Sequence, residues 1–220
     1  MLDSSCLLLG ALLLVAYLIG CAPFGLWAGR HFGGLDLRRE GSGNIGATNA
    51  ARVLGWRPGL LVLALDFAKG TLAVALAGQI TGAPAWLEAG LGAMVLFGHV
   101  APAPLRFRGG KGVATAAGAL LLIDPALLGL SFTIFFFVAA VTRLVSVASM
   151  LAALSLLPLR LVLQGGSSEA LGAGLYGSLF ILFTFLVVIL RHTSNIRRVL
   201  SGTELSLGVA PSPPSDEELC

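Results

Sequence analysis

Apolar residues run in long stretches along the chain, and short polar segments separate one stretch from the next. An α-helix needs about 20 predominantly apolar residues to cross a bilayer, and most of the stretches approach that length. Asp124-Pro125 and Arg143 mark breaks in the longest apolar region. The pattern predicts seven helices, over residues 5–29, 59–80, 85–103, 113–131, 132–142 (continuing toward 146), 146–163 and 171–190.

The composition is that of a membrane protein. Of 220 residues, 56% are hydrophobic and 11% are charged, and the mean hydropathy is +0.92. A typical soluble domain has about 25% charged residues, and a small one exposes too much surface for so few charges to cover. We therefore predict an all-α polytopic membrane protein with one domain at residues 1–204, followed by a disordered polar tail at 205–220.

Basic residues concentrate in alternate loops of this predicted bundle. All of the 14 lysines and arginines except Lys69 and Arg160 lie in the first, third and fifth loops or after the seventh helix. The opposite loops carry Asp3, Glu88, Asp124 and Glu169. Cytoplasmic loops are enriched in Lys and Arg, so the charges predict an N-terminus outside and a C-terminus inside a bacterial inner membrane.

The first basic loop is dense in groups that can bind an anion. Glycines let the backbone turn several N–H groups toward one point, and amide and hydroxyl side chains add neutral donors. An arginine adds a forked charge that suits phosphate. An ordinary turn does not need so many donors. The candidate residues are Ser42, Gly43, Asn44, Gly46, Thr48, Asn49 and Arg52.

A second glycine-rich segment leads directly into the helix predicted at 113. Free N–H groups, a helix N-terminus and a lysine together favour an anion. The GxxxxGK[ST] spacing of a P-loop is absent. The alternative interpretation is a basic anchor at the membrane interface. The candidate residues are Gly109, Gly110, Lys111, Gly112 and Thr115.

A third polar group follows the last predicted helix. His192, Asn195 and Arg198 lie roughly on one side if that helix continues. The alternative is a ring of basic residues whose side chains reach to the interface, which Arg191 and Arg197 fit better than His192 does.

Charged residues also lie inside the predicted helices. Asp66 and Lys69 are three residues apart in the second helix, where unpaired charges would be costly, so we expect a mutual pair. We assign them to structural support of the site, together with His99 and Glu204.

These motifs resemble, in order along nearly the whole chain, those of the bacterial acyl-phosphate-dependent glycerol-3-phosphate acyltransferases, the PlsY family. Five ordered motifs in a polytopic protein form a specific signal. Arg108 stands where that family usually has lysine. The family's SGNxGATN corresponds to residues 42–49, DxxKG to 66–70, GH followed by Pro to 98–102, GGKGVAT to 109–115, and HxxNIxRxxxGxE to 192–204.

The resemblance implies a seven-helix body whose cytoplasmic loops transfer an acyl group from acyl phosphate to the 1-hydroxyl of glycerol 3-phosphate. The products would be lysophosphatidate and phosphate, in the first step of phospholipid synthesis. The expected partners are these substrates and membrane lipid, with no nucleic acid. No cofactor or metal is expected, and the cysteines Cys6, Cys21 and Cys220 show no pairing pattern.

Acyl phosphate carries a good leaving group, so the protein needs to position two phosphates and stabilise an oxyanion, without a covalent intermediate. The base is either the substrate's own phosphate, as the resemblance suggests, or His192, since histidine titrates near the working pH. We assign the glycerol 3-phosphate phosphate to Ser42, Arg52, Lys111, His192 and Asn195. We assign acyl phosphate and the oxyanion to Thr48, Asn49 and the backbone of 109–112.

Two alternatives stay open. The first is an acyl-CoA-dependent acyltransferase with an HxxxxD motif, which His31 and Asp36 match by spelling. Two fixed letters in six match often by chance, and no later glycine-rich phosphate motif follows them. The second is a transporter of a phosphorylated metabolite, which would need midplane charges on several helices and an internal repeat. Only Asp66 and Lys69 approach the first requirement, and no repeat is visible.

We expect a C-terminal reporter to be active in the cytoplasm, because the alternating Lys and Arg residues hold their loops on that side of the membrane. A fusion whose reporter works in only one compartment measures this. A reporter active only in the periplasm would contradict both the orientation and the odd number of spans.

Overall fold

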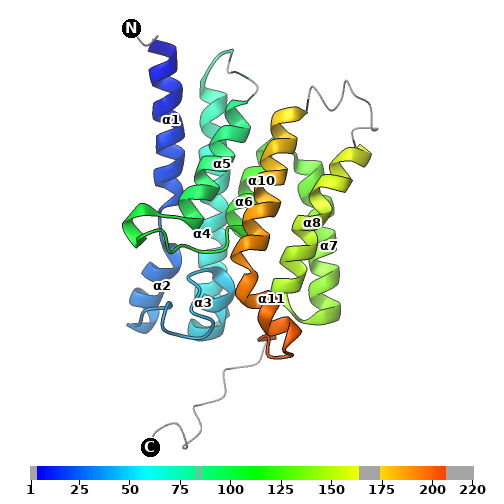
Figure 1. Ribbon diagram of the computed structural model, residues 1–220. Helices are drawn as coiled ribbons and strands as arrows, with labels where there is room; N and C mark the ends of the chain where they lie inside the picture. Colours follow the sequence, from blue (N-terminus) through cyan, green and yellow to red (C-terminus); the bar gives the residue numbers. More distant parts are fainter. Residues whose placement is uncertain (1–3, 83, 85, 164–173, 207–220) are drawn as a thin grey trace, which may run out of the picture.

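The computed structural model describes residues 4–82, 84, 86–163 and 174–206, and this part of the chain is helical with no strand. The long helices lie side by side in a bundle (Figure 1). The predicted disordered tail lies outside the described residues from 207 onward. The helices are α1 Ser4–Gly20, α2 Phe24–Gly33, α3 Ala47–Leu54, α4 Trp56–Ala75, α5 Leu87–Val100, α6 Val113–Ile123, α7 Pro125–Thr142, α8 Val145–Leu163, α10 Leu175–Arg191 and α11 Thr193–Leu200, with 3₁₀ turns at Leu76–Gln79 and Ala103–Leu105.

Among the described residues, four apolar helical segments are long enough to cross a membrane, namely Cys6–Gly33, Trp56–Gln79, Pro125–Thr142 and Val145–Leu163. Leu175–Arg191 with Thr193–Leu200, bent by 55°, makes a fifth. The other two predicted stretches contain shorter helices, α5 with 14 residues and α6 with 11. Each of the seven predicted stretches thus contains a helix among the described residues, while seven complete spans stay a prediction.

Two predicted boundaries change. The stretch at 5–29 is two helices, α1 and α2, because Pro23 lacks the N–H that a continuous helix would need there. The boundary predicted between residues 131 and 132 is wrong. Asp124 caps α7 by accepting a hydrogen bond from the Leu127 N–H at 3.1 Å, and Pro125 takes the first helical position.

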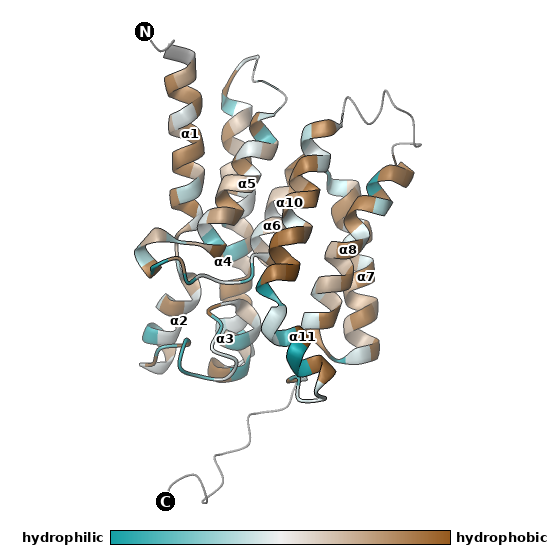
Figure 2. Cartoon of the chain, in the orientation of Figure 1, coloured by the Kyte–Doolittle hydropathy of each residue, from teal (hydrophilic) through white to brown (hydrophobic). Residues whose placement is uncertain are grey.

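The two ends of the bundle differ in polarity. The start of α1 lies at one end, and α2, α3 and α11 lie at the other (Figure 1). Hydrophilic residues gather at the second end, which we call the polar end, while the long helices are mostly hydrophobic (Figure 2). Of the polar loops that the charge pattern placed on one side, those next to α2, α3 and α11 lie at the polar end, whereas the loop between α5 and α6 crosses the bundle about halfway along it (Figure 1).

Glycines bring α4 and α6 into backbone contact. A Cβ on Gly118 would overlap the carbonyl of Phe67, and one on Gly70 would overlap the carbonyl of Thr115. Thr71 Oγ1 also donates to the Gly118 carbonyl at 2.9 Å. Helices in lipid associate largely through such close packing of small residues. The contact fixes the start of α6, and with it the loop that precedes α6.

Candidate functional site

A cleft of about 560 Å³ is lined by residues of all three polar motifs. Its walls come from residues 36–45, from the loop before α6 and from the junction of α10 and α11. Among the described residues, the lining has one acidic side chain, Asp36. The cationic lining residues are Arg38, Arg39, Arg108, Lys111, Arg191 and Arg198, and the predicted residues Ser42, Gly43, Asn44, Gly109 and Asn195 also line the cleft.

Asn49 organises the first wall. Its side chain is buried, and its Oδ1 accepts a hydrogen bond from the Ser42 N–H at 2.8 Å. Its Nδ2 donates to the carbonyls of Leu37, Glu40 and Asn44 at 3.2, 3.0 and 2.9 Å. Both polar atoms are therefore engaged in holding the loop. In this arrangement Asn49 stabilises the loop, and its assignment to acyl phosphate stays a prediction.

The remaining residues of the first motif divide between the cleft and the start of α3. Asn44 Oδ1 accepts from the Gly46 N–H at 2.8 Å, which shapes the turn into α3. Gly43 adopts a left-handed conformation with φ 71° and donates to the Glu40 carbonyl at 3.0 Å. Thr48 is exposed on α3 and does not line the cleft.

The glycine loop, residues 109–112, packs on the end of α5. The N–H groups of Gly109 and Gly110 donate to the carbonyls of Val100 and His99 at 3.2 and 3.1 Å. A Cβ on either glycine would overlap His99. These two N–H groups therefore already have backbone acceptors, and the assignment of the 109–112 backbone to the acyl phosphate stays a prediction. The two glycines allow close packing, and Gly112, with φ 85°, is the cap of α6.

Thr115 lies deeper than the glycine loop. It is fully buried in α6, against α4, and does not line the cleft. Its Oγ1 has no hydrogen-bond partner among the described residues. The structure therefore separates Thr115 from the substrate-binding candidates that line the cleft.

Lys111 is the cleft's lysine, and it is only partly exposed. Burial lowers the pKa of Lys111 to about 8, and the nearby charges of Arg198, Arg52 and Arg191 act in the same direction while Glu204 opposes them. The ammonium is therefore charged at neutral pH, although burial and the neighbouring arginines favour the neutral amine. An anion bound beside Lys111 would stabilise the charged form.

Glu204 joins three elements behind the cleft. Its carboxylate accepts hydrogen bonds from Ser146 Oγ at 2.7 Å, Asn195 Nδ2 at 2.6 Å and Arg198 Nε at 2.7 Å. Burial raises the pKa of Glu204, but these hydrogen bonds outweigh it and keep the pKa below its ordinary value. The carboxylate thus ties the start of α8 to α11 and occupies the amide N–H of Asn195.

Arg52 adjoins this group from α3. It is half-buried, and its Nη2 donates to the Leu205 carbonyl at 3.5 Å. Burial lowers the pKa of Arg52, while the charge of Glu204 raises it. Arg52 therefore lies next to the cleft and does not form part of its lining.

His192 lies at the bend between α10 and α11. It is buried, and its Nδ1 is 2.8 Å from the Val188 carbonyl. A carbonyl oxygen only accepts, so we assign the proton to Nδ1 and the free lone pair to Nε2. His192 does not line the cleft.

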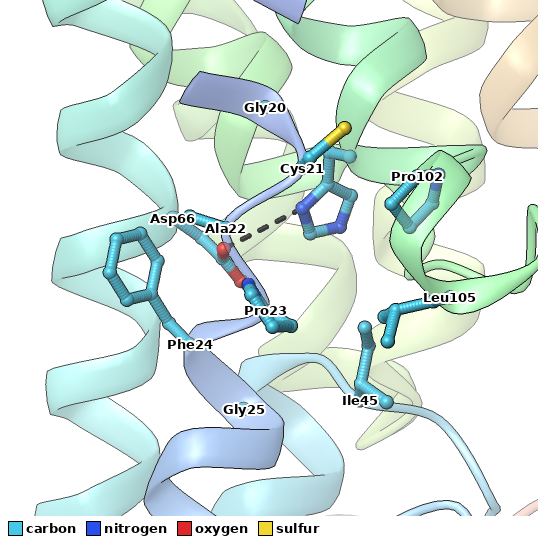
Figure 3. A pocket seen from close by; sticks show the side chains of 11 residues that line it. Gly20, Cys21, Ala22, Pro23, Phe24, Gly25, Ile45, Asp66, Pro102 and Leu105 are labelled. Carbon is cyan, nitrogen blue, oxygen red and sulfur yellow. Dashed lines mark ion pairs between the residues drawn. The ribbon is translucent and has the colours of Figure 1, made fainter. Parts of the chain in front are cut away.

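Asp66, Lys69 and His99 form a buried cluster at the α1–α2 break. Lys69 Nζ is 2.8 Å from Asp66 Oδ1, so the expected pair forms, and His99 Nδ1 is 3.5 Å from the same oxygen. Lys69 also donates to the carbonyls of Gly20 and Ala22 at 3.2 Å each. Figure 3 shows Asp66 beside the break, and its dashed line marks the contact between Asp66 and His99. The cluster joins α4 and α5 to the broken helix.

The HxxxxD alternative has no geometric support. Arg38 holds the Asp36 carboxylate through its Nε at 3.0 and 3.1 Å and its backbone N–H at 3.0 Å. These hydrogen bonds lower the pKa of Asp36 to about 2. His31 is exposed, stacks edge-on against Phe32, and forms no ion pair with Asp36 among the described residues.

Sequence reasoning missed Arg191. We interpreted it as an interface residue, but its Nε donates to the Gly110 carbonyl at 3.0 Å and its Nη2 to the Gly109 carbonyl at 2.6 Å. The available signal was its position directly before His192, at the end of the last long helix. That position alone does not reveal a partner 81 or 82 residues away.

Comparisons with known proteins agree on one family. The family model described as "Glycerol-3-phosphate acyltransferase" matches residues 10–202. A glycerol-3-phosphate acyltransferase of Thermus thermophilus is 42% identical over 196 residues, covering 89% of this chain and 94% of its own. One from Parasynechococcus marenigrum is 44% identical over 205 residues, covering 91% and 92%.

Two crystal structures of PlsY, an integral membrane glycerol 3-phosphate acyltransferase, share the fold. The glycerol 3-phosphate form has a TM-score of 0.81 and 35% identity, covering 91% of this chain and 96% of the other. The lysophosphatidic acid form has a TM-score of 0.79 and 33% identity, covering 91% and 95%.

We expect Glu204→Gln to lower the melting temperature by several degrees, because hydrogen bonds to a charged group contribute about 1.5–3 kcal/mol. Since the folded-state pKa of Glu204 is below its ordinary value, this stabilisation is present at neutral pH and is lost as the pH falls through the folded-state pKa. Thermal unfolding in detergent from pH 7 down to about pH 3 measures it. Equal melting curves for the variant and the wild type at pH 7 would contradict the joining role.

Proposed function

Because the chain belongs to the integral membrane glycerol-3-phosphate acyltransferases of the PlsY type, we propose that acyl phosphate is its acyl donor. Enzymes of this type make lysophosphatidic acid, which here would form at the 1-hydroxyl of glycerol 3-phosphate. One observation carries the proposal: six cationic side chains and a single, already paired, carboxylate line the cleft. Two phosphate-bearing substrates need such a surplus of positive charge.

The cleft supports a division of the binding work. We assign the phosphate of glycerol 3-phosphate to Ser42, Lys111 and Arg198, one lining residue from each of the three motifs. Arg52 and His192 lie outside the lining, whereas Asn195 lines the cleft and shares the Glu204 carboxylate with Arg198. Asn49 and the N–H groups of Gly109 and Gly110 already have hydrogen-bond partners. We therefore assign the phosphate of the donor to the lining arginines Arg38, Arg39 and Arg108.

The chemistry needs positioning and charge stabilisation. The 1-hydroxyl oxygen attacks the acyl carbon, the bond from that carbon to the phosphate oxygen breaks, and inorganic phosphate leaves. Cations fixed beside the reacting carbonyl stabilise the oxyanion that develops. The hydroxyl proton passes to a phosphate oxygen of the substrate. His192 is the less suitable base because it does not line the cleft.

The position of the cleft suits one water-soluble and one lipid-like substrate. Its lining combines polar and charged residues with a bundle whose long helices are mostly hydrophobic (Figure 2). Leu190 lines the cleft and is 66% exposed, which offers the acyl chain an apolar contact next to the cations. We place the polar end on the cytoplasmic side of the bacterial inner membrane, in keeping with the Lys and Arg pattern.

We expect the purified protein in detergent to form lysophosphatidate from glycerol 3-phosphate with acyl phosphate and not with acyl-CoA. Product analysis by mass spectrometry measures both reactions. Comparable rates with acyl-CoA would refute the donor, and no product with either donor would favour the transporter. As the matched variant, His31→Ala should keep most of the activity, whereas a thousandfold loss would support the HxxxxD alternative.

We expect Lys111→Ala and Lys111→Arg each to lower kcat/KM at least tenfold, since a lost charged hydrogen bond to phosphate costs about 1.5–3 kcal/mol and arginine does not reproduce a point ammonium. The active form is the ammonium, so wild-type kcat/KM should fall as the pH rises through about 8. Steady-state kinetics from pH 6 to pH 9.5 measure both effects.

Arg30→Ala, an exposed arginine outside the cleft, serves as the control and should behave like the wild type. Near-normal kinetics for Lys111→Arg would reduce Lys111 to an interface anchor.

A further inference from the structure

Arg191 connects the third polar motif to the glycine loop. It is the last residue of α10, and its guanidinium reaches two successive carbonyls, Gly110 at 3.0 Å from Nε and Gly109 at 2.6 Å from Nη2. A guanidinium presents its donors in a rigid planar fork, which can serve two adjacent acceptors at once. A side chain that only reached for the interface would direct this group to water or lipid phosphate.

The glycine loop is fixed from two sides. The N–H groups of Gly109 and Gly110 bind the end of α5, and their carbonyls bind Arg191. All four backbone polar groups of these two residues are thus engaged. Without Arg191, the two carbonyls would lose their partners and the loop would be attached to α5 alone.

Lys111 follows this doubly held segment directly. Within the described part of the chain, its ammonium forms no hydrogen bond or ion pair. Its position in the cleft therefore depends on the backbone before it, and on Gly112 and α6 after it. A displacement of about 1 Å at a positioned group can cost about a hundredfold in rate.

We propose that Arg191 is a positioning residue of the acyl-transfer site, which sets the place of Lys111 by binding the two carbonyls before it. The inference rests on the proposed function only for its kinetic readout. Arg191 also joins α10, and the bend that leads to Asn195 and Arg198, to the glycine loop. A single side chain thus fixes the position of the third motif relative to the second.

Hydrogen–deuterium exchange on the full-length protein in detergent, without substrate, tests the contact itself. We expect the Gly109 and Gly110 amides to exchange at least tenfold faster in Arg191→Gln and in Arg191→Lys, because lysine can reach one carbonyl and not both. Arg197→Gln, an exposed neighbour outside the cleft, should match the wild type. Wild-type exchange rates of these two amides in Arg191→Lys would overturn the proposal. If Arg191→Gln does not fold, the Arg191→Lys result alone decides.

Kinetics test the consequence for Lys111. We expect kcat/KM to fall about tenfold or more in both Arg191 variants, as for one lost charged hydrogen bond. Glu204, Arg198, Arg52 and Arg191 are the charges that act on Lys111. Arg191→Gln removes one charge that repels the Lys111 ammonium, so the pH at which kcat/KM falls on the alkaline side should be higher than in the wild type. Arg191→Lys keeps this charge, so the alkaline fall in kcat/KM should stay at the wild-type pH.

A general loss of stability would lower the yield of both variants without shifting the alkaline fall in kcat/KM in only one of them. An unchanged kcat/KM in Arg191→Gln, together with an alkaline fall at the wild-type pH, would overturn the positioning role. A wild-type protein inactive with acyl phosphate would refute the proposed donor, while the exchange result would still decide the contact.

Discussion

A chain embedded in lipid must satisfy its own backbone carbonyls and charges, because the surrounding solvent offers no hydrogen bonds. The structure meets this constraint with long cationic side chains on its helices. Lys69 binds the carbonyls left free where α1 breaks, and Arg160 binds the Gly174 carbonyl together with Asp124. Arg191 does the same for the glycine loop. Each of these contacts joins helices that are distant in sequence, so satisfying the backbone also fixes the arrangement of the bundle.

The same constraint explains why the cleft can hold so many like charges. Arginine and lysine side chains repel one another, and burial adds to the cost, as the pKa of Lys111 shows. Glu204 balances part of this charge from behind the lining, through Arg198 and at a longer distance through Lys111 and Arg52. The front of the cleft keeps an excess of positive charge. An anionic substrate that binds in the cleft can neutralise this excess of positive charge.

The sequence predicted the large features of the fold and of the site. Each of the seven hydrophobic stretches contains a helix among the described residues. The alternating basic loops predicted that the three motifs would lie on one side of the membrane, and all three line the same cleft. The pairing of Asp66 with Lys69 followed from the cost of burying a single charge. The start of α7 was also visible in Asp124-Pro125, although the boundary was placed elsewhere.

What could not be predicted was the partner of each polar group. Asn49 looked like a substrate ligand because its amide is a good donor and acceptor, but the loop that it faces uses both atoms. The glycines at 109 and 110 were chosen for their N–H groups, whereas the structure needs their missing side chains beside His99. Such partners depend on contacts between segments far apart in sequence, which residue type and spacing do not specify.

A lining that is both apolar and cationic also decides where each participant of the proposed reaction enters and leaves. The acyl donor and lysophosphatidate are amphiphiles that partition into the bilayer, whereas glycerol 3-phosphate and inorganic phosphate dissolve in water. Each direction of the reaction therefore joins a molecule that diffuses in two dimensions with one that diffuses in three, in the same 560 Å³. Exchange of the lipid-like molecules with the bilayer and of the water-soluble ones with the cytoplasm can thus proceed without the two competing for one entrance.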